Sequence, residues 1–143
     1  MQKQKTVGDW LKMTTSLREV QKRHKELTKK AYDLVSKKGH DYNRTQQANG
    51  DTLFNVKVAK NLGIVDTSTQ SVLIRISDKM MRLISLTKDP TVRASIKQEK
   101  VEDTIVDMIN YLVYLDCLYS EQKIDENLKE LKDIVKIMNK SKK

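Results

Sequence analysis

The chain has 143 residues, of which 38% are hydrophobic and 33% charged, and it contains four glycines and one proline. This length suffices for one domain with one core, and so few turn-forming residues argue against a β-sandwich or a β-barrel. The net charge of +9 is concentrated in residues 1–40, which hold eleven Lys and Arg against four Asp and Glu. A basic first helix attracts phosphates, nucleic acid or an acidic protein, although lysine-rich faces are also common as solvated surface.

The single cysteine, Cys117, lies inside an apolar run, and the chain has no Cys/His spacing typical of a zinc site. One cysteine cannot form an intramolecular disulfide, so a reducing compartment is expected. The N-terminal stretch has no apolar signal core, and no run approaches the roughly 18 apolar residues of a membrane span. These features predict a cytoplasmic protein without a membrane partner.

Hydrophobic periodicity predicts an all-α, single-domain bundle of four to five helices over residues 1–143. Residues 1–13 are an N-terminal extension, 14–119 the helical core, and 120–143 a C-terminal helix with a basic tail. Ser16 and Glu19 match a capping box that starts the first helix, and Gly39 is expected to end it. Its buried face is predicted from spacings of three and four, and comprises Leu17, Val20, His24, Leu27, Ala31 and Leu34.

After a polar loop at 40–51, a short helix is predicted over 52–62, ending at Gly63. Asp66, Thr67 and Ser68 can cap the next helix, over 69–86. Its core stripe is predicted to comprise Leu73, Ile76, Met80, Leu83 and Ile84. Beyond Pro90, helical patterns cover 95–119 and 120–139, and the pattern leaves open whether the chain bends near Ser120.

The helix predicted over 95–119 carries acids on one side. At about 100° per residue, Glu99, Asp103, Asp107 and Asn110 share a face, while an apolar stripe (Val101, Ile105, Met108, Leu112 and Leu115) lies opposite. Apolar neighbours predict that Asp107 and Asn110 are at least partly buried, and a buried carboxylate needs compensation for its charge. One possibility is a salt bridge to a cation of the preceding helix, namely Arg75, Lys79 or Arg82. The other is a hard divalent cation such as Mg²⁺, which carboxylates one turn apart can share.

Three stretches, in this order and spacing, resemble a known family. They are KKGHDYN (37–43) followed by LFNVKVAKNLGI (53–64), RISDKMMRL (75–83), and the motif ExxxDTxxDxxNY from Glu99 to Tyr111. Together they resemble nucleotide modification associated domain 1, a phage and bacterial family formerly classed as a domain of unknown function. The likeness covers about residues 20–119. It implies a phage-type protein associated with nucleotides, acting in a bacterial cytosol.

Glu99, Asp103 and Asn110 also resemble, more distantly, the second-helix signature of MazG-like all-α nucleoside triphosphate pyrophosphatases. In those enzymes acids from two helices hold Mg²⁺, which bridges the triphosphate while water attacks it. The usual pair of glutamates on the first of these helices is missing here, and the equivalent helix offers Asp78 among three cations. That departure could leave a site that binds phosphate without cleaving it efficiently.

We assign the candidate residues to three roles: metal ligands, catalytic acids, and contacts to phosphate or nucleotide. Asp78, Glu99 and Asp103 would hold Mg²⁺, and together with Asp107 they would form the catalytic acids. Cations of the preceding helix would neutralise phosphate charge as it develops. The residues assigned to phosphate or nucleotide are Arg75, Lys79, Arg82, Asn110 and Tyr42. Tyr111 and Tyr114 are expected in the core or at a subunit interface.

Two functions therefore stay open. One is a nucleotide-binding protein, or a Mg²⁺-dependent nucleoside triphosphate pyrophosphohydrolase. The other is a non-catalytic accessory protein that binds a host or phage protein through the basic first helix, with Lys22, Arg23, Lys25, Lys29 and Lys30 as its surface. Nucleic acid is the less favoured partner, because no stacking aromatics accompany the charges. A homo-oligomer is expected, since the last helix carries a long apolar seam and MazG-like bundles are commonly oligomers.

Overall fold

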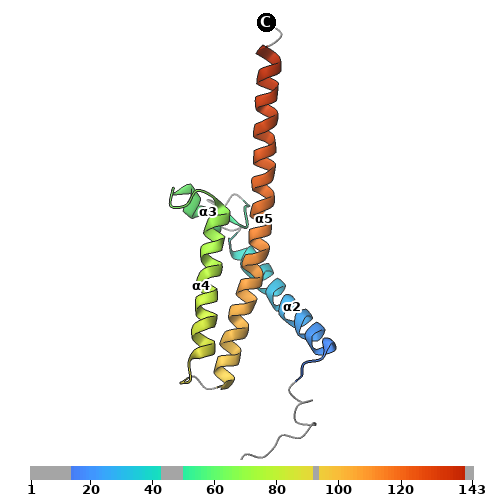
Figure 1. Cartoon of the computed structure of the whole chain (residues 1–143), viewed down its shortest axis with the longest axis vertical. Coiled ribbons are helices and arrows are strands. Elements are labelled where there is room, and N and C mark those ends of the chain that lie inside the picture. Colours follow the sequence, from blue (N-terminus) through green and yellow to red (C-terminus); the bar gives the residue numbers. More distant parts are fainter. Residues whose placement is uncertain (1–13, 43–49, 92–93, 141–143) are drawn as a thin grey trace, which may run out of the picture.

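The structure is a computed structural model that describes residues 14–42, 50–91 and 94–140, without the side chains of 39–42 and 94–95. Within these residues it contains four helices and no strands (Figure 1). They are α2 (Leu17–Tyr42), α3 (Phe54–Asn61), α4 (Ser68–Lys88) and α5 (Ala94–Lys140). The predicted all-α bundle with a long C-terminal helix is confirmed. The extension predicted at 1–13 lies outside the described residues.

The start of α2 is confirmed as a capping box, but its predicted end is wrong. The Ser16 backbone N–H donates to the Glu19 carboxylate at 2.8 Å, and the Glu19 N–H donates to the Ser16 hydroxyl at 3.2 Å. Gly39 does not stop the helix, which continues to Tyr42. A glycine inside a helix costs only about 1 kcal/mol relative to alanine, so the helix can pass through it.

Local signals also fix the two shorter helices. Gly63, at φ +73°, takes the left-handed conformation just beyond α3, as expected for a glycine that ends a helix. At the start of α4, the Gln70 N–H donates to the Thr67 hydroxyl at 3.2 Å, and the Thr67 N–H donates to the Gln70 side chain at 3.3 Å. This second capping box selects Thr67 from the three capping candidates of the sequence.

The last element, α5, is one continuous helix of 47 residues, which resolves the question of a bend at Ser120. Its N-terminal half packs against α4 and α2, whereas its C-terminal half extends beyond the other helices (Figure 1). Every described residue from 123 to 140 is exposed. In the described part of the chain, no helix is long and apolar enough to cross a membrane.

The core lies where α2 and α4 meet the N-terminal half of α5. Its buried apolar residues are Ala31, Val72, Val106 and Leu118, and its buried polar residues are Ser71, Thr104 and Asn110. Small and polar side chains thus occupy much of the helix contact, because they let the backbones of α4 and α5 approach closely. The prediction that Asn110 is buried is confirmed.

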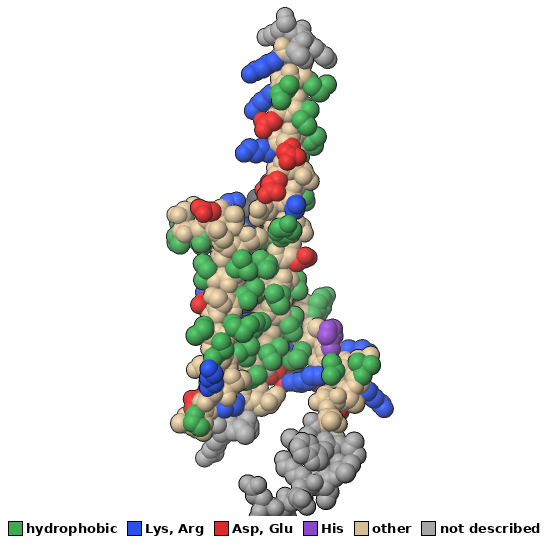
Figure 2. Space-filling view, viewed as in Figure 1, with side chains coloured by type: hydrophobic (Ala, Val, Ile, Leu, Met, Phe, Trp, Pro, Cys, Tyr) green, Lys and Arg blue, Asp and Glu red, His purple; other side chains and the backbone are tan. Residues whose placement is uncertain are grey.

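Several predicted core positions are exposed instead. On α4, Leu73, Met80 and Ile84 are 39–51% exposed, and on α5 Leu112 is 51% exposed. The N-terminal part of the predicted α2 stripe, including His24, is exposed as well. Figure 2 shows hydrophobic side chains spread over the outer face of α4 and α5. The prediction failed here because periodicity identifies an apolar stripe but not which side of a helix meets its neighbour.

Candidate functional site

Asp107 on α5 faces α4, where it forms an ion pair. The Lys79 ammonium donates to the Asp107 carboxylate at 2.7 Å, and the two side chains are only 21% and 30% exposed. Both residues project from helices that pack along one another, so the pair bridges the α4–α5 contact. This salt bridge is one of the two compensations considered for the acid, and Lys79 supplies it.

The other acids proposed as metal ligands lie elsewhere. Asp78, Glu99 and Asp103 are exposed, and the structure describes no ion pair for any of them. Among the described residues, no group of three or more His, Cys, Asp or Glu side chains is placed to hold a metal ion. Of the four acids proposed for the site, Asp107 is the one with a described ion pair to a neighbouring helix.

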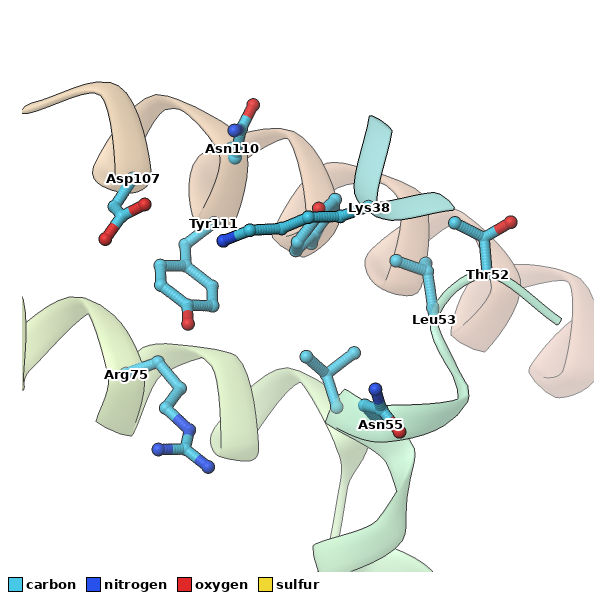
Figure 3. Close-up of a pocket in the computed structure, with 10 residues that line it drawn as sticks. Lys38, Thr52, Leu53, Asn55, Arg75, Asp107, Asn110 and Tyr111 are labelled. Carbon is cyan, nitrogen blue, oxygen red and sulfur yellow. The ribbon is translucent and has the colours of Figure 1, made fainter. Parts of the chain in front are cut away.

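A cavity of about 250 Å³ opens beside this ion pair. Its walls come from four segments: the C-terminal part of α2, the start of α3, one turn of α4 and two turns of α5 (Figure 3). Lys38 reaches it from α2 and Arg75 from α4, and Asp107 lies at its α5 side. Two helices therefore contribute a positively charged residue to the lining of this cavity.

The α5 wall combines a buried amide with two aromatic rings. Asn110 is 8% exposed and lines the cavity, yet its amide makes no hydrogen bond with another described residue. Tyr111 and Tyr114 line the same space, with ring centroids 6.0 Å apart in an edge-to-face arrangement. No buried side-chain nitrogen or oxygen of the described residues lacks a hydrogen-bond partner, so the Asn110 amide retains some access to solvent. An amide both donates and accepts, so it can hydrogen-bond a ligand in the cavity.

The opposite wall is formed by residues 52–56 at the start of α3. Leu53 and Val56 provide apolar surface, and Asn55 and Thr52 polar groups (Figure 3). This wall is tied to α5 by Lys57, which donates to Asp51 at 2.7 Å and to Glu121 at 2.8 Å. Burial on its own lowers the pKa of Lys57, but its hydrogen bonds with the two carboxylates outweigh burial and raise that pKa. Lys57 therefore stays charged and holds α3 in place.

Three of the predicted site residues line the cavity: Arg75, Asp107 and Asn110. Lys79 adjoins it through its ion pair with Asp107. Arg82 is exposed and does not line it, and the side chain of Tyr42 lies outside the described residues.

Five polar lining residues were not predicted from the sequence: Lys38, Thr52, Asn55, Tyr111 and Tyr114. The two tyrosines were assigned to packing because each lies among apolar residues. One signal could have identified Tyr111: it follows Asp107 by four residues, so both lie on one face of α5.

A second polar contact joins α2 to α5 at Glu102, an acid that the sequence analysis did not single out. Its carboxylate accepts hydrogen bonds from both Arg23 and Lys30, and its side chain is 17% exposed. These hydrogen bonds lower the pKa of Glu102, and the bond from Lys30 has the larger effect. Two of the five cations proposed as a basic docking surface are thus engaged in helix packing.

Two further cations of that surface pair along α2 itself. The Lys29 ammonium lies 2.6 Å from the carboxylate of Asp33, and that of Lys22 lies 3.9 Å from Glu26. Such i,i+4 pairs are exposed and stabilise a helix by a few tenths of a kcal/mol. They leave less uncompensated positive charge on α2 than the sequence suggests.

Comparisons of the chain with models of protein families, with curated proteins and with solved structures give no match.

Proposed function

We propose that the chain binds a nucleotide in the cavity between α2, α3, α4 and α5. The observation that carries the proposal is Asn110, which is largely buried, lines this space and has no described side-chain hydrogen bond. An amide that both donates and accepts suits the edge of a nucleobase. The Lys38 ammonium and the Arg75 guanidinium suit a phosphate, which guanidinium groups bind with parallel hydrogen bonds.

The surface of the cavity favours a single nucleotide. Its volume of about 250 Å³ is just below the usual range of ligand sites, so part of a nucleotide would extend beyond it. Apolar side chains line one wall and two tyrosines line another. A flat base would contact these surfaces, whereas a polymer needs an extended groove with a row of cations. The family resemblance of the sequence points to the same ligand class.

A narrower proposal is that the chain also hydrolyses the bound nucleoside triphosphate with the help of Mg²⁺. Mg²⁺ is commonly bound by one or two carboxylates together with the phosphates of a substrate. Asp107 fits that limited role, in which Lys79 would move from the carboxylate to a phosphate oxygen. Mg²⁺ would polarise the phosphate, and Arg75 would stabilise the charge that develops during attack by water. Release of pyrophosphate from nucleoside triphosphates in the presence of Mg²⁺ or Mn²⁺ tests this narrower proposal, and its absence would leave binding alone.

Calorimetric titration with a panel of ordinary and modified nucleotides tests the binding proposal. We expect saturable binding, weakened about tenfold by Asn110→Ala and about tenfold or more by Arg75→Gln, because each loses hydrogen bonds to the ligand. Arg82→Gln is the matched control, since Arg82 also lies on α4 but does not line the cavity. Equal effects of Arg75→Gln and Arg82→Gln would contradict the proposed site.

The accessory-protein alternative depends on the exposed cations of α2. Lys25 remains without a described ion pair there, and Lys22 and Lys29 are only paired along the helix. Substituting these three lysines with Glu should abolish capture of a bacterial or phage protein if this surface is the contact. Retention of that partner by the triple variant would reject the alternative.

A further inference from the structure

The C-terminal half of α5 carries an apolar stripe that no described residue covers. We call it the seam; it consists of Ile124, Leu128, Leu131 and Val135. Each of these side chains is 48–59% exposed. Their spacing alternates four and three residues, which is the heptad pattern of a helix that packs against another helix. Most of the stability of a helix in a protein comes from packing of its apolar face, so the seam calls for a partner.

Charges beside the seam indicate what the partner is. Asp125 and Lys132 are one heptad apart and flank the seam on the same side. The structure describes no ion pair for either, whereas Lys136 and Asp133 on the outer face lie 3.7 Å apart. A helix with one acid and one base seven residues apart on the same flank is complementary to its own antiparallel copy.

We propose that two copies of the chain associate through their seams as an antiparallel, two-fold helix pair. In the register that places Leu128 opposite Leu131 of the second copy, Ile124 lies opposite Val135 of that copy. The same register places Asp125 beside Lys132 of the second copy, and the two-fold axis repeats this ion pair. In a parallel pair, Asp125 would instead lie beside Ser120 of the second copy and Lys132 beside its Asn127, and neither of these residues is charged.

This arrangement leaves the rest of the molecule free. Because the helices run in opposite directions, the two helical bodies lie at opposite ends of the paired segment. The nucleotide cavity lies beside Asn110, which is 14 positions before Ile124, so the seam contact leaves it open. The dimer therefore does not depend on the proposed function, and each can fail separately.

Sedimentation equilibrium on the full chain tests the dimer, and charge reversal tests its register. Asp125→Lys and Lys132→Asp should each raise the dimer dissociation constant about tenfold, because each creates two like-charge contacts. The double variant should restore the wild-type constant. Lys129→Asp is the matched control, since Lys129 lies on the outer face and should change little. Circular dichroism of each variant should match that of the wild type, because the seam lies outside the folded body.

The single cysteine gives a direct measure of direction. Cys117 is exposed, so a spin label can be attached to it without further substitution. In the proposed register the two copies of residue 117 are offset by 25 positions, or about 37 Å at 1.5 Å per residue. A distance below about 20 Å would indicate a parallel pair and overturn the proposal. A chain that stays monomeric at all concentrations would also overturn the proposal. So would a dimer that the double substitution Leu128→Glu, Leu131→Glu leaves unchanged, because its contact would then lie elsewhere, on the exposed apolar face of α4 and α5.

Discussion

Single residues explain how an almost wholly apolar stretch of α5 accommodates acids. Asp107 lies against Lys79, and Asn110 lines a cavity without a described side-chain hydrogen bond. Only the C-terminal part of the polar stripe, Asp107 and Asn110, is thus partly or fully buried, as the helical spacing predicted for these two residues. The helical spacing could not predict that Asp78, Glu99 and Asp103 stay exposed, because their environment depends on where the neighbouring helices end.

The Lys79–Asp107 pair should contribute to stability as a unit. Because both side chains are half-buried, Lys79→Met should lower the free energy of unfolding by about 1–2 kcal/mol, between the values for exposed and fully buried pairs. Asp107→Asn in the same background should then cost less than it does alone. Urea unfolding of both single variants and the double variant measures the coupling. Additive losses would show that the pair contributes nothing of its own.

Glu102 should make stability depend on pH. Its pKa is lowered in the folded chain by hydrogen bonds from Lys30 and Arg23. The stabilisation is therefore complete above the ordinary pKa of a glutamate and is lost as pH falls through the lower, folded value. We expect wild type to be more stable than Glu102→Gln by on the order of 1 kcal/mol at pH 7. This difference should vanish in acid, and a difference that persists unchanged there would contradict the assignment.

At the scale of elements, short-range signals predicted helix starts better than helix faces. Both capping boxes and the Gly63 stop follow from side chains within a few positions of a helix end. The seam of α5 was also visible in the sequence, because a heptad pattern needs no knowledge of the fold. The exposure of Leu73, Met80 and Leu112 could not be predicted from the sequence, because it depends on which sides of α4 and α5 meet.

The two capping boxes should differ in their effect on stability. Thr67→Ala should lower the free energy of unfolding by about 1 kcal/mol, because α4 packs along α5 and its first turn adjoins buried Ser71 and Val72. Ser16→Ala should mainly fray the first turn of α2, where residues 14–22 are exposed. Hydrogen exchange measures both changes. Thr67→Ala should reduce amide protection throughout the protein, whereas Ser16→Ala should reduce it only in the first turn of α2. Equal global effects would contradict this distinction.

At the scale of the whole molecule, α2, α3 and α4 all attach to one part of α5. Glu102 holds α2, Lys57 holds α3, and the Lys79–Asp107 pair holds α4. The cavity forms where these attachments converge, so its lining comes from segments more than 70 residues apart in the chain. Such a convergence cannot be predicted from helical periodicity, which explains why Lys38 and Asn55 were missed. The lining residues that the sequence did predict, Arg75, Asp107 and Asn110, lie in the motifs of α4 and α5.

We propose above that the cavity between these helices binds a nucleotide. The most direct test is a nitrogen-15 correlation spectrum of the full chain, recorded during titration with the nucleotide that calorimetry ranks first. Binding in the cavity predicts saturable shifts at residues 38, 52–56, 75 and 107–114, with loss of saturation in Asn110→Ala. Shifts confined to the exposed lysines of α2, or no saturable shift with any nucleotide of the panel, would contradict the claim.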